Sequence, residues 1–382
     1  MTQGRDTLFI VCGEPSGETY AAGVARAFRK RVPGAVLEGV GSRRLAAEGV
    51  RLHLDYERIS VVGLFEVAFH LPAILGALRN TARRATAPDV GAVLLVDFPD
   101  FNFRVGKRAA ARGVPVVYFI PPQLWAWRKG RARELASFTK GVVVPFPFEE
   151  PILREAGVDV RFAGHPLLTE LAPVLDAAPE PGRFGIPEGG PVVGLLPGSR
   201  DGEIRTHFPL MVRAAETLAQ RLPGVRFIVP LADRRFRPLI DGGLRGSPVC
   251  ATIVEEDRHR AFLLMDAALC ASGTATLELS LLGIPPVIVY RTSFPTYWIG
   301  KRLVSVRSIG LPNIVAGEPF LPELIQGECR PDRMADELAA LLSDAGRRET
   351  VRGKCLALRA RLRGEGPYEA AAEMLERVWR GA

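Results

Sequence analysis

Two short turns in the second half of the chain carry residue types that bind nucleotides. The first is VVGLLPGSRDGE (192–203) and the second is ASGTATLE (271–278). In each, an apolar run too short for a helix stops at a glycine-containing turn and then continues as a predicted helix. Such a turn presents backbone N–H groups at a helix N-terminus, where phosphate oxygens can be bound. Two turns of this kind in one half of a chain favour one nucleotide.

Polar side chains at these turns match the parts of a nucleotide. Arg200 can bind a diphosphate through two parallel charge-assisted hydrogen bonds, and Ser272 and Thr274 are candidate helix caps. Glu278 lies about one turn into the second helix, where its carboxylate can accept hydrogen bonds from both hydroxyls of a ribose. The alternative for either turn alone is that it closes an ordinary α/β unit and that Arg200 pairs with a surface carboxylate.

Acidic residues in the first half follow two predicted buried strands. Glu14 follows strand 7–12, and Asp97 and Asp100 follow strand 91–96. Ligands of α/β sheets bind at the carboxyl ends of the strands, where a carboxylate can act as a general base. The spacing is not the D-x-D pattern that holds a metal and a diphosphate, so no metal is expected. The alternatives are that Asp97 caps the next helix and that Glu14 faces a helix dipole.

Histidine and cysteine usage predicts neither a metal centre nor a disulfide framework. The five histidines lack metal-ligand spacing. His165, which precedes a proline, is a candidate acid or phosphate ligand, with a structural role as the alternative. The five cysteines are odd in number and include no C-x-x-C pair, which predicts reduced core thiols. The G-x-G-x-x-G fingerprint of dinucleotide binding is absent, so NAD is not expected and no cofactor is predicted.

Strand and helix patterns alternate along the chain and divide it in two. Segment 172–191 is rich in Pro, Gly and Ala without periodicity, which predicts an interdomain linker. We therefore expect an α/β protein with two Rossmann-like, doubly wound domains, 1–172 and 173–349, facing a central cleft. We expect 311–317 to be a loop with Asn313 available to a phosphate or sugar.

The longest apolar stretch of the chain is 60–78. Because it includes two ionisable residues and Pro72, a membrane-spanning helix is not expected. It can be an ordinary buried helix. It can also be a surface helix that dips into a membrane interface, with Arg79, Arg83 and Arg84 meeting lipid headgroups.

Composition indicates a globular cytoplasmic protein with a basic surface. The 382 residues, 47% hydrophobic and 24% charged, suffice for two domain cores. The formal charge of +8 is compatible with a solvated face, a nucleic-acid surface or anionic lipid. No nucleic-acid motif accompanies the charge, so nucleic acid is not an expected partner. The N-terminal apolar run is too short for a signal peptide, which predicts a cytoplasmic location.

Ten short motifs cover nearly the whole chain in a characteristic order. They are GEPSGE (13–18), VVGLFEV (61–67), DFPDFN (97–102), WAWR (125–128), FAGHP (162–166), LLPGSR (195–200), ASGTATLE (271–278), KRLV (301–304), LPNIVAG (311–317) and ELIQ (323–326). Each is weak alone, but the ordered set resembles the lipid-A-disaccharide synthase family. Glu18, Leu45 and Phe98 depart from the commoner family pattern, which bears on acyl-chain preference more than on reaction type.

The resemblance implies a metal-independent, inverting glycosyltransferase of the GT-B fold. Such enzymes join UDP-2,3-diacylglucosamine to 2,3-diacylglucosamine 1-phosphate through a β-1′,6 bond and release UDP. The family is peripheral on the cytoplasmic face of the inner membrane of Gram-negative cells and can form a homodimer. The resemblance also implies that C-terminal helices, at about 350–382, cross back to join the N-terminal domain.

The resemblance further implies roles for individual residues. Asp97 matches the general base that takes the proton from the acceptor 6-hydroxyl, and Glu14 matches a second essential acidic group. Positions that match the UDP and substrate site are Ser199, Arg200, Ser272, Gly273, Thr274, Glu278 and Asn313. The family view also favours a membrane-facing patch in the apolar stretch, namely Val62, Leu64, Phe65, Val67 and Phe69.

Other functions remain as alternatives. UDP-sugar 2-epimerases share a two-lobed, metal-free architecture, and a GT-B transferase can use another lipid acceptor. A non-enzymatic alternative is a nucleotide-sensing membrane scaffold, which would use Arg200 and Glu278 but would not need Asp97.

Overall fold

The computed structural model describes residues 5–56, 64–122, 130–187, 189–292 and 308–381, with side chains for all of these except 64–71. The chain forms two compact units. Unit 1 consists of Met1–Pro166 and Leu362–Ala382, and unit 2 consists of Leu167–Arg361. The division at Pro166 lies six residues before the predicted boundary at 172.

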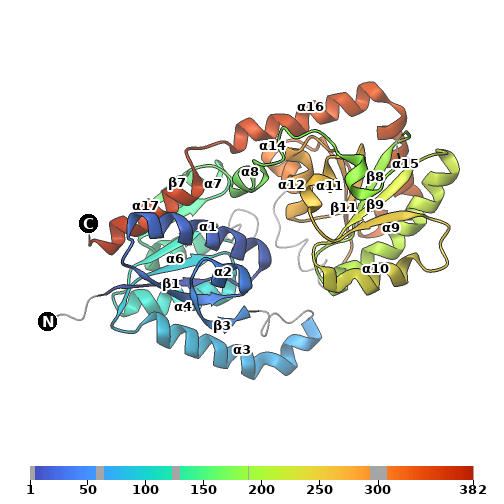
Figure 1. Ribbon diagram of the computed structural model, residues 1–382. Coiled ribbons are helices and arrows are strands. Elements are labelled where there is room, and N and C mark those ends of the chain that lie inside the picture. The colour runs from blue at the N-terminus through green and yellow to red at the C-terminus, as the bar shows by residue number, and fades with distance from the viewer. Residues whose placement is uncertain (1–4, 57–63, 123–129, 188, 293–307, 382) are drawn as a thin grey trace. The chain divides into compact units, whose positions relative to one another are not determined.

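Unit 1 is built on a seven-stranded parallel sheet with the order β3-β2-β1-β4-β5-β6-β7 (Figure 1). Its strands are rich in Val, Leu and Ile, and all residues of β1, β4 and β5 are buried, as expected of a parallel sheet covered on both faces. The strands are β1 (Thr7–Val11), β2 (Val36–Gly41), β3 (Arg51–Asp55), β4 (Val90–Val96), β5 (Val116–Phe119), β6 (Gly141–Val144) and β7 (Val160–Phe162).

The helices of unit 1 cover both faces of this sheet. Helices α1 and α17 pack together, and α3 and α4 pack together on the opposite side (Figure 1). The helices are α1 (Pro15–Arg31), α2 (Arg43–Ala47), α3 (Leu64–Ala85), α4 (Pro99–Ala111), α6 (Gly130–Phe138), α7 (Glu149–Glu155) and α17 (Pro367–Trp379), with α8 (Pro166–Leu171) at the boundary of the units.

Unit 2 is built on a six-stranded parallel sheet with the order β10-β9-β8-β11-β12-β13. The strands are β8 (Val192–Leu196), β9 (Arg226–Pro230), β10 (Ala251–Val254), β11 (Ala267–Ala271), β12 (Pro286–Tyr290) and β13 (Glu323–Ile325). The helices are α9 (Asp201–Arg221), α10 (Arg237–Leu244), α11 (Arg258–Phe262), α12 (Thr274–Leu281), α14 (Leu311–Ala316), α15 (Pro331–Ser343) and α16 (Ala345–Leu362), with short 3-10 helices η2 (Pro181–Phe184), η3 (Arg234–Phe236) and η4 (Gln326–Glu328).

Both sheets have the strand order of a Rossmann fold. In unit 1 the first strand, β1, lies beside β4, and in unit 2 the first strand, β8, lies beside β11. At these points the chain changes the direction in which it adds strands, which opens a crevice at the carboxyl ends of the two central strands. The predicted doubly wound fold is therefore confirmed for both units.

The last helix of the chain belongs to the first unit. Tyr368 of α17 lies directly over Gly23 of α1, where an added Cβ would be 2.6 Å from the tyrosine ring, and its ring packs against Phe119. Near the other end of α17, Trp379 makes an edge contact with Phe28. The predicted return of the C-terminal helix to the first domain is confirmed for α17.

Helix α16, however, belongs to unit 2, so the prediction that the chain returns from about residue 350 is wrong by some twelve residues. Its Cys355 is buried against Ile288 and Leu321. Arg359 Nε donates to Leu281 O at 2.6 Å. These contacts hold α16 to unit 2 up to the last turn of the helix.

Candidate functional site

Asp97 follows β4 directly and has an unusual backbone. Its φ is +48° and that of Phe98 is +52°, the left-handed region that non-glycine residues rarely adopt. Two side chains fix this conformation, because Asn102 Nδ2 and the Tyr118 hydroxyl each donate to Asp97 O at 2.7 Å. The N-cap of α4 is Phe98, without a side-chain cap, so the alternative that Asp97 caps the helix is wrong.

The two predicted acidic residues lie at the carboxyl ends of neighbouring strands. Asn102 Nδ2 also contacts Val11 O, the last residue of β1, at 3.4 Å. Glu14 follows three residues later as the N-cap residue of α1. A Cβ added to Gly17, in the first turn of α1, would lie 3.4 Å from Asp97 Cβ, so this turn passes close to Asp97. The acidic pair therefore lies at the switch point of the first sheet.

Carboxylates influence two buried groups at this edge of the first sheet. The pKa of the Cys12 thiol is raised well above its ordinary value by burial and then by the carboxylates of Glu18 and Asp97. Burial and the Asp97 carboxylate likewise raise the pKa of Tyr118 well above its ordinary value, so its hydroxyl keeps its proton and stays a donor. An acidic group here suits the removal of a proton from a neutral substrate.

Glu18, which departs from the family pattern, is a structural carboxylate. It is 4% exposed and accepts hydrogen bonds from the backbone N–H of Ser42 at 2.6 Å and of Leu45 at 3.0 Å. The Tyr56 hydroxyl donates to its other oxygen at 3.2 Å. Glu18 thus supplies acceptors to the N-terminus of α2, whose own N-cap residue makes no side-chain cap.

In unit 2, the turn between β8 and α9 contains the predicted diphosphate ligands. Ser199 and Arg200 are exposed, and Gly198 has a φ of +126° that favours glycine. The Glu203 carboxylate reaches back over the turn, accepting from Ser199 N at 2.9 Å and lying 3.3 Å from Arg200 Nη1. The pairing of Arg200 with a surface carboxylate is therefore observed. Because the guanidinium is half exposed, this pair is weak and can be exchanged for a ligand.

His207 supports this turn, although in the sequence it is only a lone histidine within a predicted helix. It is 2% exposed, its Nδ1 lies 3.0 Å from Pro197 O, and its Nε2 accepts from Arg291 N at 3.0 Å. These partners require the neutral tautomer with the proton on Nδ1. Burial lowers the pKa of His207, which keeps it neutral. His207 therefore ties the end of β8 to the end of β12.

The second turn lies between β11 and α12. The N-cap residue is Gly273, without a side-chain cap, so the prediction that Ser272 and Thr274 cap this helix is wrong. The Ser272 hydroxyl instead donates to Ile309 O at 3.3 Å. Gly273 is exposed, and Ser272 and Thr274 are partly exposed. The two turns follow β8 and β11, so they lie together at the switch point of the second sheet.

The predicted loop at 311–317 is a helix, α14, and its Asn313 is fully engaged. This residue is 1% exposed. Its Nδ2 donates to Leu321 O at 2.9 Å and to Glu323 Oε1 at 2.7 Å, and its Oδ1 accepts from the N–H of Phe320 and Leu321. The prediction that Asn313 is freely available to a phosphate is therefore wrong. The loop prediction failed because LPNIVA is too short to show helical periodicity.

Asn313 is nevertheless linked to the second turn. It holds Glu323, whose carboxylate accepts from Ile309 N at 2.9 Å and from Gly310 N at 3.1 Å. Ile309 O in turn accepts from the Ser272 hydroxyl. A chain of hydrogen bonds therefore runs from Asn313 to the turn before α12.

Glu278 lies buried on α12, with 4% of its surface exposed. One oxygen, Oε1, is 2.8 Å from Arg258 Nη2. Burial alone raises the pKa of this carboxyl, but Arg258 and His259 outweigh burial, so the pKa lies below its ordinary value and the group is ionised. Its other oxygen, Oε2, lies 3.5 Å from His259 Nε2, so both oxygens of this buried carboxylate face basic side chains of α11.

His165 is buried, and its ring packs against Phe146 at 5.2 Å. Burial lowers its pKa to about 3. Its backbone N–H donates to Leu362 O at 2.9 Å. An imidazole with this pKa is neutral at pH 7, which favours the structural alternative over the role of an acid.

Val62, one residue of the predicted membrane patch, lies outside the described residues. Leu64, Phe65, Val67 and Phe69 lie at the start of α3, but their side chains are outside the description. At the other end of α3, Arg84 contacts Glu38 at 2.7 Å and Asp89 at 2.6 Å, so the prediction that Arg84 meets headgroups is wrong. Among the described residues, no helix is long and apolar enough to span a membrane.

Four of the five cysteines are buried, as predicted. Cys12, Cys270, Cys329 and Cys355 are buried, but Cys250 is exposed, so the prediction of a core thiol is wrong for Cys250. Within the described ranges, no group of three or more His, Cys, Asp or Glu residues is arranged to hold a metal.

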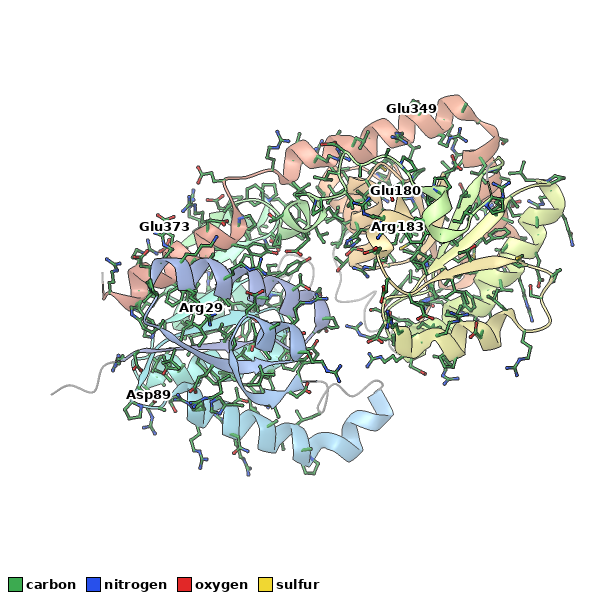
Figure 2. The ribbon with its side chains drawn as sticks, viewed as in Figure 1. Arg29, Asp89, Glu180, Arg183, Glu349 and Glu373 are labelled. Carbon is green, nitrogen blue, oxygen red and sulfur yellow. The ribbon has the colours of Figure 1, made fainter. Side chains whose placement is uncertain are left out.

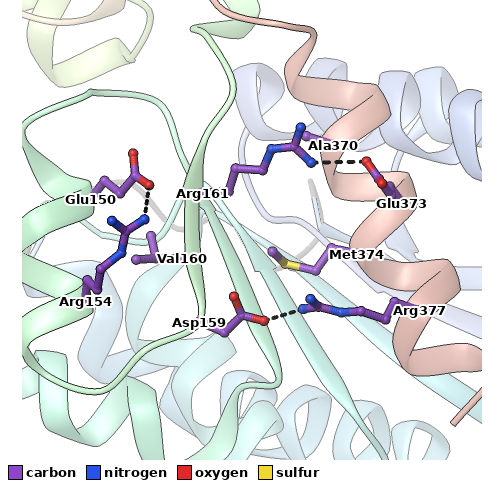
Figure 3. Close-up of a pocket in the computed structure, with 9 residues that line it drawn as sticks. All are labelled: Glu150, Arg154, Asp159, Val160, Arg161, Ala370, Glu373, Met374 and Arg377. Carbon is purple, nitrogen blue, oxygen red and sulfur yellow. Dashed lines mark hydrogen bonds and ion pairs between the residues drawn. The ribbon is translucent and has the colours of Figure 1, made fainter. Parts of the chain in front are cut away.

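One cavity, of about 250 Å³, lies in unit 1 where α17 meets β7 and α7, and none of the predicted site residues lines it (Figure 3). The three arginines in its lining pair with carboxylates, as Arg161 does with Glu373 at 3.1 Å. The arginine charges are thus already compensated, and the cavity is part of the contact between α17 and the rest of unit 1.

Solved structures with this fold define the class of protein. The chain is similar to UDP-GlcNAc 2-epimerase from Neisseria meningitidis, with a TM-score of 0.59 and 13% identity over 98% of this chain and 99% of the other. It is also similar to MurG from Acinetobacter baumannii, with a TM-score of 0.55 and 13% identity over 97% of this chain and 99% of the other. At this identity the likeness shows the fold alone, which is the two-domain GT-B fold.

Sequence comparison places the chain within this class. A family model described as lipid-A-disaccharide synthetase matches residues 8–377. The lipid-A-disaccharide synthases of Myxococcus xanthus and Syntrophus aciditrophicus are each 40% identical to the chain, over 96% of both sequences in each pair. The chain belongs to the lipid-A-disaccharide synthetase family. The epimerase alternative is not favoured, because epimerases share only the fold.

Proposed function

We propose that this chain is the glycosyltransferase that joins UDP-2,3-diacylglucosamine to 2,3-diacylglucosamine 1-phosphate, giving a lipid A disaccharide 1-phosphate and UDP. One observation in this family member carries the proposal. The acidic pair follows the two central strands of the sheet in unit 1, and the two proposed phosphate-binding turns follow the two central strands of the sheet in unit 2. Ligands of such sheets bind at this position.

Asp97 is the proposed general base. Its carboxylate takes the proton from the acceptor 6-hydroxyl as that oxygen attacks the anomeric carbon of the donor sugar. The new C–O bond forms on the face opposite the leaving group, and the bond to the diphosphate breaks with its electron pair on UDP, so the configuration inverts. Glu14, at the end of the neighbouring strand, is the proposed second acidic group of the site.

UDP is proposed to bind at the two turns of unit 2. Arg200 exchanges its weak contact with Glu203 for the diphosphate. The other proposed contacts to the diphosphate come from Ser199, Ser272, Gly273 and Thr274. Glu278 is proposed to accept hydrogen bonds from the ribose. Asn313 is proposed to support the site through Glu323 and Ile309, rather than to contact UDP itself.

Metal independence is part of the proposal, because Arg200 and the N–H groups of two turns supply positive potential to the leaving diphosphate. We also propose that the enzyme is peripheral on the cytoplasmic face of the inner membrane. Both proposed substrates are acylated, the chain has a formal charge of +8, and the apolar start of α3 is the proposed contact with lipid. A homodimer is proposed on the family resemblance alone.

The test is turnover of the two proposed substrates in detergent micelles with EDTA present, following the disaccharide by mass spectrometry. Formation of disaccharide and UDP supports reaction, substrate class and metal independence together. Folded protein that binds UDP but makes no disaccharide would contradict the proposed acceptor. Epimer formation from UDP-GlcNAc would instead support the alternative activity.

A further inference from the structure

The two residues that follow β12 are each held by a side chain from another element of unit 2. The backbone N–H of Arg291 donates to His207 Nε2, on α9, at 3.0 Å. The N–H of Thr292 donates to Gln326 Oε1 at 3.0 Å, and its carbonyl accepts from Gln326 Nε2 at 3.1 Å. Gln326 directly follows β13, so its amide extends the pairing of β12 with β13 beyond the last backbone pair.

The backbone of Gln326 has an unusual conformation. Its φ is +52°, in the left-handed region that non-glycine residues rarely adopt. Such a conformation persists only where the surrounding structure fixes it, and it is concentrated at functional sites. The two hydrogen bonds to Thr292 therefore hold the end of β12 in one position, and with it the N–H of Arg291.

His207 connects this fixed point to the turn after β8. Side chains fill the space between α9 and the strands of unit 2 (Figure 2). His207 is one of the buried residues of α9, with 2% of its surface exposed. Because Arg291 N is a donor, Nε2 must be the acceptor, and the Nδ1–H then donates to Pro197 O at 3.0 Å. Pro197 begins the turn, so one imidazole connects the turn with the end of β12.

A second contact from α9 to this turn competes with the proposed ligand. Glu203 accepts from Ser199 N at 2.9 Å and lies 3.3 Å from Arg200 Nη1. Both groups are proposed to bind the diphosphate, so bound UDP would displace the Glu203 carboxylate from them. The bond from His207 ends on the carbonyl of Pro197, which does not bind anions. Of these two contacts, the one from His207 is therefore the one that remains when UDP binds.

We propose that His207 is a positioning residue of the donor site, which braces the diphosphate-binding turn against the end of β12 and so lowers the cost of ordering this turn when UDP binds. This inference rests on the proposed UDP site. His207 acts through the backbone of Pro197, and Gln326 acts through Thr292 and Arg291. A preorganised turn binds its ligand more tightly, because less conformational entropy is lost on binding.

The experiment is titration calorimetry of the full chain with UDP, combined with steady-state kinetics in detergent micelles. His207→Leu, which has no hydrogen-bonding group, is expected to weaken UDP binding by about tenfold. The donor KM should rise by a similar factor, while the acceptor KM stays within about twofold of the wild-type value. His207→Asn can still donate to Pro197 O, and His207→Gln can still accept from Arg291 N, so each is expected to lose less affinity than His207→Leu.

Met211→Ala is the matched control. Met211 lies four residues further along α9 and is buried in the apolar core of unit 2. Its truncation should lower the free energy of unfolding through the cavity that it leaves, but UDP affinity should stay within about twofold of the wild-type value. This control separates the bracing of the turn from a general loss of stability.

A double-mutant cycle tests the connection through the end of β12. Gln326→Leu alone is expected to weaken UDP binding by about threefold. In the His207→Leu background it should change UDP affinity by less than about twofold, because the connection to the turn is already broken.

The inference is overturned if His207→Leu binds UDP as tightly as the wild type, if Met211→Ala reproduces its effect, or if the effects of His207→Leu and Gln326→Leu are additive. A wild type that does not bind UDP would instead overturn the proposed nucleotide site itself. If His207→Leu does not fold, the same cycle with His207→Asn decides, since this variant also lacks the acceptor for Arg291 N.

Discussion

At the scale of single residues, the backbone of Asp97 explains why its neighbours matter. A left-handed conformation at a non-glycine residue has to be stabilised by its surroundings. Asn102 and Tyr118 do so by donating to the Asp97 carbonyl from α4 and β5. Together they set the direction in which the Asp97 carboxylate leaves the strand.

The first prediction concerns the proposed base. Asp97→Asn should lower turnover by roughly 10²- to 10⁴-fold, because an amide cannot accept the proton. UDP affinity, measured by calorimetry, should stay within a few-fold. Asp100→Asn is the matched control, since Asp100 is exposed and pairs with Arg131. Equal losses in the two variants, or full activity of Asp97→Asn, would contradict the role of Asp97.

The second prediction concerns the residues that position Asp97. Asn102→Ala should lower kcat by roughly 10- to 100-fold with little change in KM, because small displacements of a catalytic group are costly. The pH dependence of kcat should shift, since the surroundings of the carboxylate change. Tyr118→Phe, which removes one of the two bonds to the carbonyl, should have a smaller effect. An unchanged kcat in folded Asn102→Ala would contradict the role of Asn102 in positioning Asp97.

The third prediction follows from the buried His165. Its pKa is about 3 in the folded chain and about 6.5 when unfolded. Below pH 6.5 the unfolded chain therefore binds a proton that the folded chain does not, so stability is lost as the pH falls from 6.5 toward 3. The expected loss at pH 5 is about 2 kcal/mol.

Urea unfolding at pH 7.5 and pH 5 checks this prediction. His165→Gln should remove about 2 kcal/mol of the difference in unfolding free energy between the two pH values, whatever its effect at pH 7.5. An identical pH difference in the variant and the wild type would mean that other groups cause the acid sensitivity.

At the scale of elements, the functional residues are held by contacts between turns. A Cβ added to Gly13, after β1, would lie 2.3 Å from Phe98 Cγ, so the Phe98 ring rests on bare backbone. In unit 2, His207 connects the turn after β8 with the residue after β12. The site elements therefore depend on each other's positions.

The fourth prediction tests the docking of α17. Gly23→Ala should lower the free energy of unfolding by about 1 to 2 kcal/mol, because the new methyl group collides with the buried Tyr368 ring. Gly353→Ala in α16 is the control, since nothing lies within 4 Å of its added Cβ. It should raise the free energy of unfolding by about 0.5 to 1 kcal/mol. Equal stability changes in denaturant unfolding would refute the close contact.

At the scale of the whole molecule, the proposed functions of proton removal and UDP binding belong to different Rossmann units. The acidic pair belongs to unit 1 and the cationic turn to unit 2. The chain leaves unit 1 at Pro166 and returns at Leu362, so α17 covers a sheet whose strands all precede residue 163. The net charge of +8 is a property of the entire chain.

The fifth prediction concerns lipid surfaces. The protein should cosediment more strongly with vesicles that contain anionic lipid than with neutral vesicles. Binding to the anionic vesicles should weaken between 0.05 and 0.5 M salt, because the Debye length falls roughly from 14 Å to 4 Å and the charges are screened. Leu64→Ser with Phe65→Ser should weaken binding at every salt concentration if the start of α3 enters the interface. Vesicle binding that is independent of both lipid charge and these substitutions would contradict the proposed peripheral association with the membrane.

Patterns along the chain predicted the class of fold, the family and the positions of the two glycine-containing turns of unit 2. These follow from local signals, because apolar runs, glycine turns and ordered motifs depend only on neighbours along the chain. Even where the helix caps at Ser272 and Thr274 were predicted wrongly, the turn itself was found, since Gly273 alone can end the strand pattern.

The contacts of each polar side chain, in contrast, depend on how distant segments pack. Asn313 was expected to be available to a phosphate or sugar, but its amide group donates hydrogen bonds to Leu321 and Glu323. His207 carried no sequence signal, and its position between two turns arises because β12 brings Arg291 to it. Hydrogen-bond partners separated by tens of residues are set by packing, which no local pattern encodes.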